Sequence, residues 1–181
     1  WEFLNRGHNV WTCDLERTEC KEVPHYIGDV FDAFEMYGED FRWDLIILHP
    51  PCTALCVAGN RHYAPRGIPS PERSEAIHWT LRLWDDACEW SERVALENPV
   101  GVLSSAWRPP DQYIQPWQFG HGETKKTGLW LHNLPPLEPT DIVEGREQKI
   151  WKMPPSPDRG KERSRFYPGI AKAMAEQWGK L

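Results

Sequence analysis

Apolar residues fall in short runs along the chain, separated by polar or proline-rich stretches. The most continuous run covers residues 45–48 without polar alternation, which is typical of a strand buried on both faces of a parallel sheet. Pro50 and Pro51 end this strand, because proline cannot donate a hydrogen bond to a sheet ladder. Further apolar runs predict strands at 10–13, 94–99 and 127–131, and a short apolar segment precedes Asp29.

Helical signals lie between these strands. Ser70 can cap a helix whose first position is Pro71, and we expect this helix to extend to about Arg93. A shorter helix is predicted over 31–37 and a final helix over 168–178. The order strand, long helix, strand predicts two parallel strands joined by a right-handed crossover, and therefore an α/β fold.

Length and composition fit a single domain of 181 residues with a real core. The net charge of −6 argues against broad, non-specific nucleic-acid binding, although residues 152–165 form a local basic segment. No apolar stretch approaches the roughly 20 residues of a membrane helix, so no membrane partner is expected. The five cysteines include no Cys-x-x-Cys pair, which argues against a metal site and fits a reduced, cytoplasmic setting.

Two chemically useful side chains follow strands of the predicted sheet. Cys52 lies on the first turn beyond strand 45–48, and Glu97 lies near the carboxyl end of strand 94–99. In open α/β sheets ligands bind at this edge, so a thiol and a carboxyl group are expected to meet there. Cys52 is then a candidate nucleophile, and the alternative is a buried structural thiol.

Two acidic residues follow apolar segments earlier in the chain. Asp14 ends strand 10–13, where a carboxylate can accept hydrogen bonds from ribose hydroxyls. Asp29 follows the next apolar segment and can accept a hydrogen bond from an adenine amino group. Each residue also has a simpler interpretation. Asp14 can be a solvated turn residue or a helix cap, and Asp29 can be a helix cap.

Three polar regions are candidates for contacts with a polyanion. The loop 53–69 is long and cationic and carries Asn60 and Arg61, so it is either a closing loop or an ordinary surface loop. Residues 124–127 form a donor cluster that can hold phosphate or make an ordinary turn. The basic segment 152–165 is the third region, and it contains Arg163.

The order Asp14, Asp29, Pro51-Cys52 and Glu97-Asn98-Pro99 resembles the DNA cytosine-5 methyltransferases, especially small phage-encoded members. The resemblance implies a Rossmann-like, S-adenosylmethionine-dependent fold with a mostly parallel sheet and helices on both faces. It implies a catalytic core over 1–100 and 166–181 and a loop-rich, target-recognition-like insertion over 101–165. The family's first strand and glycine loop would precede Trp1, so the chain is expected to be truncated and to bind its cofactor weakly.

The same resemblance implies roles for single residues. Cys52 would attack position 6 of cytosine, Glu97 would bind the ring nitrogen at position 3, and S-adenosylmethionine would supply the methyl group for position 5. The substrate would be double-stranded DNA with the cytosine flipped out, in a bacterial or phage-infected cell. The implied cofactor contacts are Asp14, Leu15, Asp29, Val30 and Pro50. The expected DNA contacts are Asn60, Arg61, Thr124, Lys125, Lys126 and Arg163.

Three other functions remain open. An amino-methyltransferase carries Asp or Asn before two prolines and an aromatic residue after them, whereas this chain has His49 and Cys52 in those places. A thymidylate-synthase-like enzyme also places a cysteine after prolines, but it needs a longer chain and leaves Glu97-Asn98-Pro99 unexplained. A methyltransferase fold that only binds DNA or a host protein fits the acidic net charge.

Overall fold

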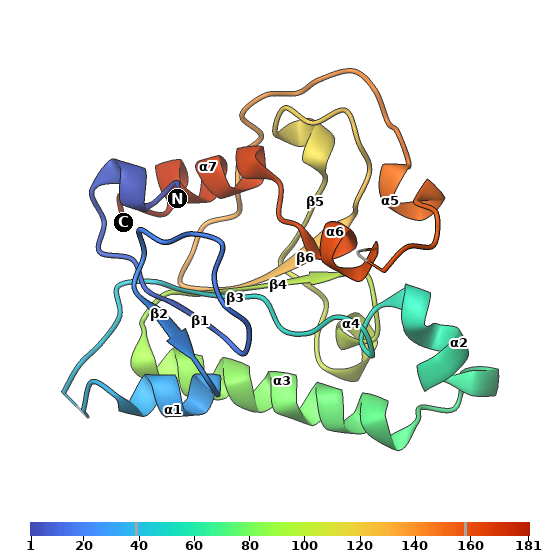
Figure 1. Cartoon of the computed structure of the whole chain (residues 1–181), viewed down its shortest axis with the longest axis horizontal. Helices are drawn as coiled ribbons and strands as arrows, with labels where there is room; N and C mark the ends of the chain where they lie inside the picture. The colour runs from blue at the N-terminus through green and yellow to red at the C-terminus, as the bar shows by residue number, and fades with distance from the viewer. Residues whose placement is uncertain (39, 158) are drawn as a thin grey trace.

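The structure is a computed structural model of the chain, and it describes residues 1–38, 40–157 and 159–181 (Figure 1). The strands are β1 Thr12–Asp14, β2 His25–Ile27, β3 Ile46–Leu48, β4 Val94–Pro99, β5 Gln112–Ile114 and β6 Thr127–His132. The helices are α1 Val30–Glu35, α2 Asn60–Tyr63, α3 Pro71–Trp90, α4 Leu103–Ala106, α5 Lys149–Lys152, α6 Arg159–Ser164 and α7 Pro168–Gln177. Short 3-10 turns are η1 Leu4–Arg6, η2 Val57–Gly59, η3 Pro65–Gly67 and η4 Pro116–Gln118.

The strands form two separate sheets. One has four strands in the order β3-β4-β6-β5, and the other consists of β1 and β2 alone. The parallel pairing of β3 with β4 confirms the prediction made from the strand–helix–strand order. β1 and β2 are also parallel.

The expectation of a mostly parallel sheet is wrong for the four-stranded sheet. β6 pairs antiparallel with both β4 and β5, so this sheet is mixed. A parallel connection needs a crossover of a dozen or more residues that is usually helical. β5 and β6 are joined by a loop with one 3-10 turn and no crossover helix, which fits an antiparallel pair. β4 and β5 are each antiparallel to β6, so they run in the same direction without being neighbours in the sheet.

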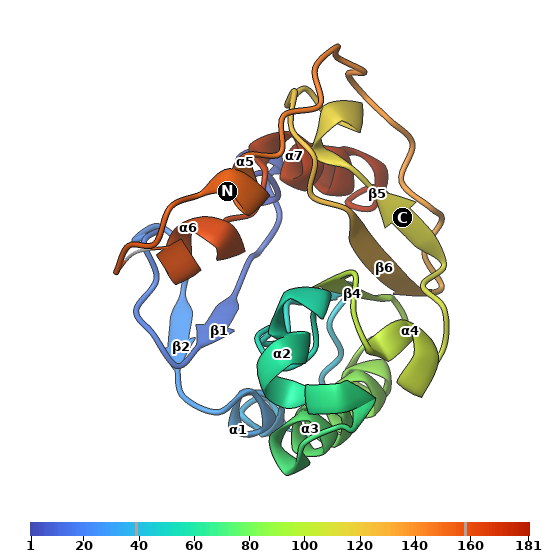
Figure 2. The same cartoon turned by 90° about the vertical axis from the view of Figure 1, so that its right-hand side faces the viewer.

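Helices cover both faces of the larger sheet, as expected (Figures 1 and 2). On β4, Val94 and Leu96 point to one core while Ala95 points to the other, which is the period of two of a strand buried on both sides. The first core, which packs against α1 and α3, contains Phe34, Leu48, Leu55, Leu83, Trp84, Ala87, Val94, Leu96, Leu103 and Trp130. The second core, which packs against α7, contains Ala95, Ile114, Phe119, Leu129, Leu134, Leu137, Ile170, Ala173, Met174 and Trp178.

The predicted helix boundaries agree with the structure to within a few residues. The Ser70 side chain accepts a hydrogen bond from the backbone nitrogen of Arg73, so it caps α3 as expected. The helix ends at Trp90, three residues before the predicted end, where Ser91 turns extended. α7 buries Ile170, Met174 and Trp178 on one face, as the sequence spacing indicated.

Within the described residues, no helix is both long and apolar enough to cross a membrane.

Candidate active site

The carboxyl ends of β3 and β4 place a histidine beside the predicted catalytic carboxyl group. Leu48 pairs with Leu96, so the next residues, His49 and Glu97, lie side by side. The Nδ1 atom of His49 is 3.2 Å from Oε2 of Glu97. The Glu97 side chain is only 12% exposed, whereas that of His49 is 48% exposed. The carboxyl group is therefore shielded but reachable from the side of His49.

Asn98 links the end of β4 to the proline turn that carries Cys52. Its Nδ2 atom donates to the carbonyl oxygen of Pro50 over 3.3 Å, and the residue is 1% exposed. The Oδ1 atom of Asn98 is buried and has no hydrogen-bond partner among the described residues. Because this buried amide donates a hydrogen bond to the proline turn, it fixes the turn relative to β4.

Cys52 does not stand alone, because Cys56 lies one turn further along the same loop. The backbone nitrogen of Cys56 donates to the carbonyl oxygen of Cys52 over 2.9 Å, and the two thiols are hydrogen-bonded to each other. Both residues are half-buried. Cys56 was not predicted as a site residue from the sequence, although its spacing of four residues from Cys52 was a usable signal.

The two thiols have pKa values shifted in opposite directions. The hydrogen bond from Cys52 lowers the pKa of Cys56 to about 5, with help from the backbone N–H groups of Gly59 and Ala58 and from the charge of Arg163. The same hydrogen bond raises the pKa of Cys52, and burial and the charge of Glu97 raise it further. The hydrogen bond between the two thiols therefore favours a single negative charge on the pair, and the N–H groups of Gly59 and Ala58 favour its placement on Cys56.

The loop after Cys52 packs against the segment that follows β4. The backbone nitrogen of Val57 donates to Val100 over 3.0 Å, and that of Val102 donates to Leu55 over 2.8 Å. Gly101 lies between these bonds, where any Cβ atom would collide with the carbonyl oxygen of Leu55. A glycine is needed here because the two backbones approach so closely.

The segment before α7 adds aromatic and cationic groups near the site. The ring of Phe166 meets that of His49 edge-on, with 5.1 Å between centroids. The Nζ atom of Lys125 is 5.8 Å from the ring centroid of Tyr167 and donates to the carbonyl oxygen of Arg165 over 3.2 Å. The charge of Lys125 lowers the pKa of Cys52, in opposition to Glu97. The fold thus brings Lys125 and the thiols together.

The other predicted DNA contacts lie in different surroundings. Arg163 lies close enough to Cys56 to affect its pKa, whereas the Nζ atom of Lys126 is 4.1 Å from the ring centroid of Tyr113 on β5. Thr124 is bonded to the carbonyl oxygen of Glu147 through its backbone nitrogen, over 2.9 Å. On the loop 53–69, Asn60 accepts a hydrogen bond from Arg73, and Arg61 donates to His62.

The predicted cofactor residues line the ends of β1 and β2, except Pro50. Asp14 and Asp29 are exposed, and each accepts a local backbone hydrogen bond, Asp14 from Glu16 and Asp29 from Phe31. The second of these bonds caps α1, so the simpler interpretation of Asp29 is present in the structure. Leu15 is 78% exposed and Val30 packs against the first core. Pro50 is buried below the cysteine turn.

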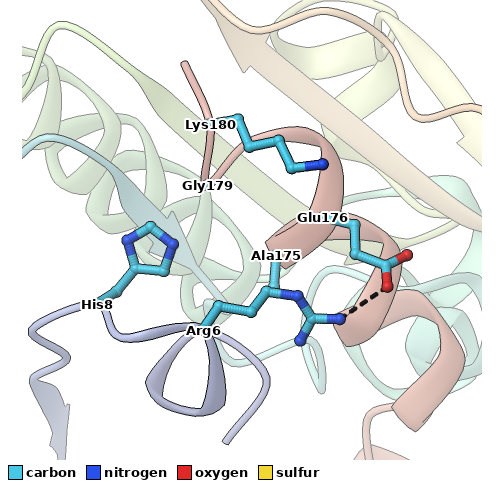
Figure 3. A pocket seen from close by; sticks show the side chains of 6 residues that line it. All are labelled: Arg6, His8, Ala175, Glu176, Gly179 and Lys180. Atoms are coloured by element: carbon cyan, nitrogen blue, oxygen red, sulfur yellow. Dashed lines mark hydrogen bonds and ion pairs between the residues drawn. The ribbon is translucent and has the colours of Figure 1, made fainter.

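A pocket of about 490 Å³ lies away from these residues, between η1 and the C-terminal end of α7 (Figure 3). It is lined by residues 6, 8, 175, 176, 179 and 180, and the guanidinium of Arg6 closes one side through a 2.8 Å contact with Glu176. None of the predicted catalytic, cofactor or DNA residues lines this pocket.

No protein-family model matches the chain, and no curated protein sequence matches it. Among solved structures, it is similar to the crystal structure of a candidate DNA modification methyltransferase encoded within a prophage (E. coli), with a TM-score of 0.50 and 14% sequence identity. This likeness shows the fold. It covers 86% of this chain and 51% of the other, so the chain spans about half the length of the protein that it resembles.

Proposed function

We propose that this chain is the catalytic part of a DNA cytosine-5 methyltransferase, which moves a methyl group from S-adenosylmethionine to position 5 of a flipped-out cytosine. The observation that carries the proposal is the meeting of Cys52 and Glu97 at the carboxyl ends of two adjacent parallel strands, close enough for the carboxylate to raise the pKa of the thiol. A solved structure of the same fold, described as a candidate DNA modification methyltransferase, supports it.

The chemistry assigns distinct tasks to the clustered groups. Attack of the Cys52 sulfur on position 6 of cytosine forms a C–S bond and moves the ring electrons toward position 5 and the nitrogen at position 3. Glu97 donates a proton or a hydrogen bond to that nitrogen as charge develops there. The sulfur of Cys56, which is hydrogen-bonded to Cys52 and has a lowered pKa, accepts the thiol proton when Cys52 attacks.

The nucleoside half of S-adenosylmethionine fits the residues that follow β1 and β2. Asp14 and Asp29 present exposed carboxylates there, and Leu15 leaves most of its apolar side chain uncovered. The backbone nitrogen of Gly28 donates to Asp14 over 3.1 Å, which holds the two strand ends together. In this proposal the carboxylates bind the ribose and the adenine edge, and Leu15 covers the adenine face. The cofactor when bound would supply an electrophilic methyl group.

A negatively charged chain needs a local cationic surface to bind DNA. Lys125 and Arg163 supply positive charge at the thiols themselves. Phosphates on either side of a flipped base would be neutralised there, which is the electrostatic part of DNA binding. The affinity is then expected to fall steeply with salt.

The test is covalent capture of the protein on duplex DNA that contains 5-fluorocytosine, with saturating S-adenosylmethionine. The fluorine blocks the final loss of a proton from position 5, so the C–S bond persists. Wild type should form a complex that survives denaturing gels, Cys52→Ser should not, and Cys20→Ser should behave as wild type.

A second measurement distinguishes a thiol that does not add to cytosine from a protein that does not bind the cofactor. Release of tritium from position 5 of cytosine requires only addition and reversal by the thiol, and not methyl transfer. Tritium release without capture would locate the defect at the cofactor residues. Absence of both, in a protein that binds the DNA, would contradict the proposal.

That last outcome would favour a second candidate, a methyltransferase fold that binds DNA or a protein without chemistry. The observation in its favour is that β1 and β2 form a sheet of their own, so the cofactor residues are not tied into the larger sheet.

A further inference from the structure

Arg73 is a deeply buried charge whose described hydrogen bonds all go to neutral acceptors. It lies in the first turn of α3 and is 3% exposed. Its Nε atom donates to the carbonyl oxygen of Ala54 over 2.7 Å, Nη1 to Oδ1 of Asn60 over 2.9 Å, and Nη2 to the carbonyl oxygen of Cys56 over 3.5 Å. Burying a guanidinium without a carboxylate is costly unless its donors are well used.

All three acceptors lie within residues 54–60, the segment that directly follows Cys52. A planar guanidinium has its donors in a fixed geometry, so one side chain can set the relative positions of three points on a loop. The carbonyl oxygen of Cys56 is among these points, while the backbone nitrogen of Cys56 is held by the carbonyl oxygen of Cys52. Cys56 is therefore fixed from both sides.

We propose that Arg73 is the positioning residue of the cysteine loop, and that it holds the sulfur of Cys56 in hydrogen-bonding contact with Cys52. Its importance for methyl transfer rests on the proposed function. The state of the two thiols can be measured without DNA or cofactor, so the two proposals can fail separately.

Asn60 acquires a different role in this arrangement. It was predicted from the sequence to contact DNA, but its Oδ1 atom accepts a hydrogen bond from the guanidinium of Arg73. The two roles, contact with Arg73 and contact with DNA, predict opposite effects for Asn60→Asp. A carboxylate at this place strengthens the contact with Arg73, whereas it repels a DNA phosphate.

The first experiment compares Arg73→Gln with wild type by the pH dependence of alkylation with iodoacetamide. Trypsin cleaves after Arg42 and Arg61, and the resulting peptide contains Cys52 and Cys56 as its only cysteines. Fragmentation of this peptide in a mass spectrometer assigns the label to one sulfur or the other. Each protein must first show the same circular dichroism spectrum as wild type at the assay temperature.

In Arg73→Gln the two alkylation profiles should move toward each other, with Cys52 reacting at lower pH and Cys56 at higher pH than in wild type. A shift of about one pH unit each is expected when a hydrogen bond to a thiolate is lost. The other charged groups that act on the thiols, Glu97, Lys125 and Arg163, are unchanged in this variant. The matched control is Arg82→Lys, an exposed arginine on the same helix, and its profiles should equal those of wild type.

Asn60 variants keep the proposal testable if Arg73→Gln does not fold. Asn60→Ala removes one of the three acceptors and should give a smaller shift in the same direction, while Asn60→Asp should keep the wild-type profiles. Wild-type profiles in a folded Arg73→Gln, or in Asn60→Ala, would overturn the positioning role. A shift in Arg73→Gln with no capture of DNA by wild type would instead uphold it and count against the proposed function.

Discussion

The two parallel strand pairs of this chain carry comparable chemistry in very different settings. β4 carries Glu97 near its carboxyl end and β3 leads to Cys52, and both strands belong to a four-stranded sheet with cores on both faces. β1 and β2 end near Asp14 and Asp29, and they form a two-stranded sheet whose acidic side chains are exposed. Both pairs place polar groups at the carboxyl ends of strands, but only the first fixes them by buried contacts.

The difference shows what a site gains from a continuous sheet. At the thiol edge, Asn98 and Arg73 are nearly inaccessible to solvent, and their hydrogen bonds hold the proline turn and the loop beyond it. At the nucleoside edge, the hydrogen bonds that the acidic groups accept within the described part of the chain come from backbone atoms two residues away. We therefore expect substitutions at the thiol edge to have larger effects than substitutions at the nucleoside edge.

The largest effect is expected for Glu97→Gln. An amide cannot supply a proton to the cytosine ring, and a general acid is typically worth about 10²- to 10⁴-fold in rate. Tritium release from cytosine measures the loss, and Glu92→Gln, an exposed residue near the start of the same strand, is the matched control. A Glu97→Gln rate within about threefold of wild type would remove the carboxyl group from the mechanism.

Cys56→Ala should change the pH dependence of Cys52. The pKa of Cys52 is raised chiefly by its hydrogen bond to Cys56, so the substitution should lower this pKa toward its ordinary value. The pH profile of Cys52 alkylation, measured on the tryptic peptide, should then move to lower pH by about one pH unit or more. An unchanged or higher midpoint would show that burial and Glu97, rather than Cys56, dominate.

Asn98→Ala should destabilise the thiol edge by about 1–2 kcal/mol, because the buried carbonyl oxygen of Pro50 loses its donor. The urea midpoint at constant slope measures this loss. The comparison variant is Asn133→Gly, which removes a similar amide contact to the carbonyl oxygen of Glu92 at an exposed position, where the backbone φ of +51° suits glycine. Equal losses in the two variants would contradict the special role given to burial.

The smallest effects are expected at the nucleoside edge. Asp29→Ala removes the cap of α1 and should reduce stability by about 1 kcal/mol, while Asp14→Ala should change it by a few tenths, roughly the value of an exposed turn contact. Both should weaken binding of S-adenosylmethionine in calorimetry. If only Asp29→Ala has any effect, and only on stability, Asp29 acts as a helix cap and neither residue holds the cofactor.

Local patterns were enough to predict much of the fold. The apolar run before Pro50, the Ser70-Pro71 cap and the spacing of Ile170, Met174 and Trp178 each specify a local geometry, and the structure contains all three elements. The meeting of Cys52 and Glu97 followed from two such elements and the rule that parallel strands end at the same edge. The antiparallel placement of β6 was missed, because the connection that allows it was assigned to a loop-rich insertion.

The sequence by itself determined the strands, the caps and the edge at which a thiol and a carboxyl group meet, because these depend on neighbouring residues and on strand order. Only the tertiary structure decided that the thiols of Cys52 and Cys56 are hydrogen-bonded, that Lys125 acts on the pKa of Cys52, and that Arg73 binds the loop of residues 54–60. Lys125 is far from both cysteines in the sequence. Cys52 and Cys56 lie in an irregular loop, where the directions of their side chains do not follow from a helix or strand period. Such contacts depend on which surfaces pack together, and no local periodicity records that choice.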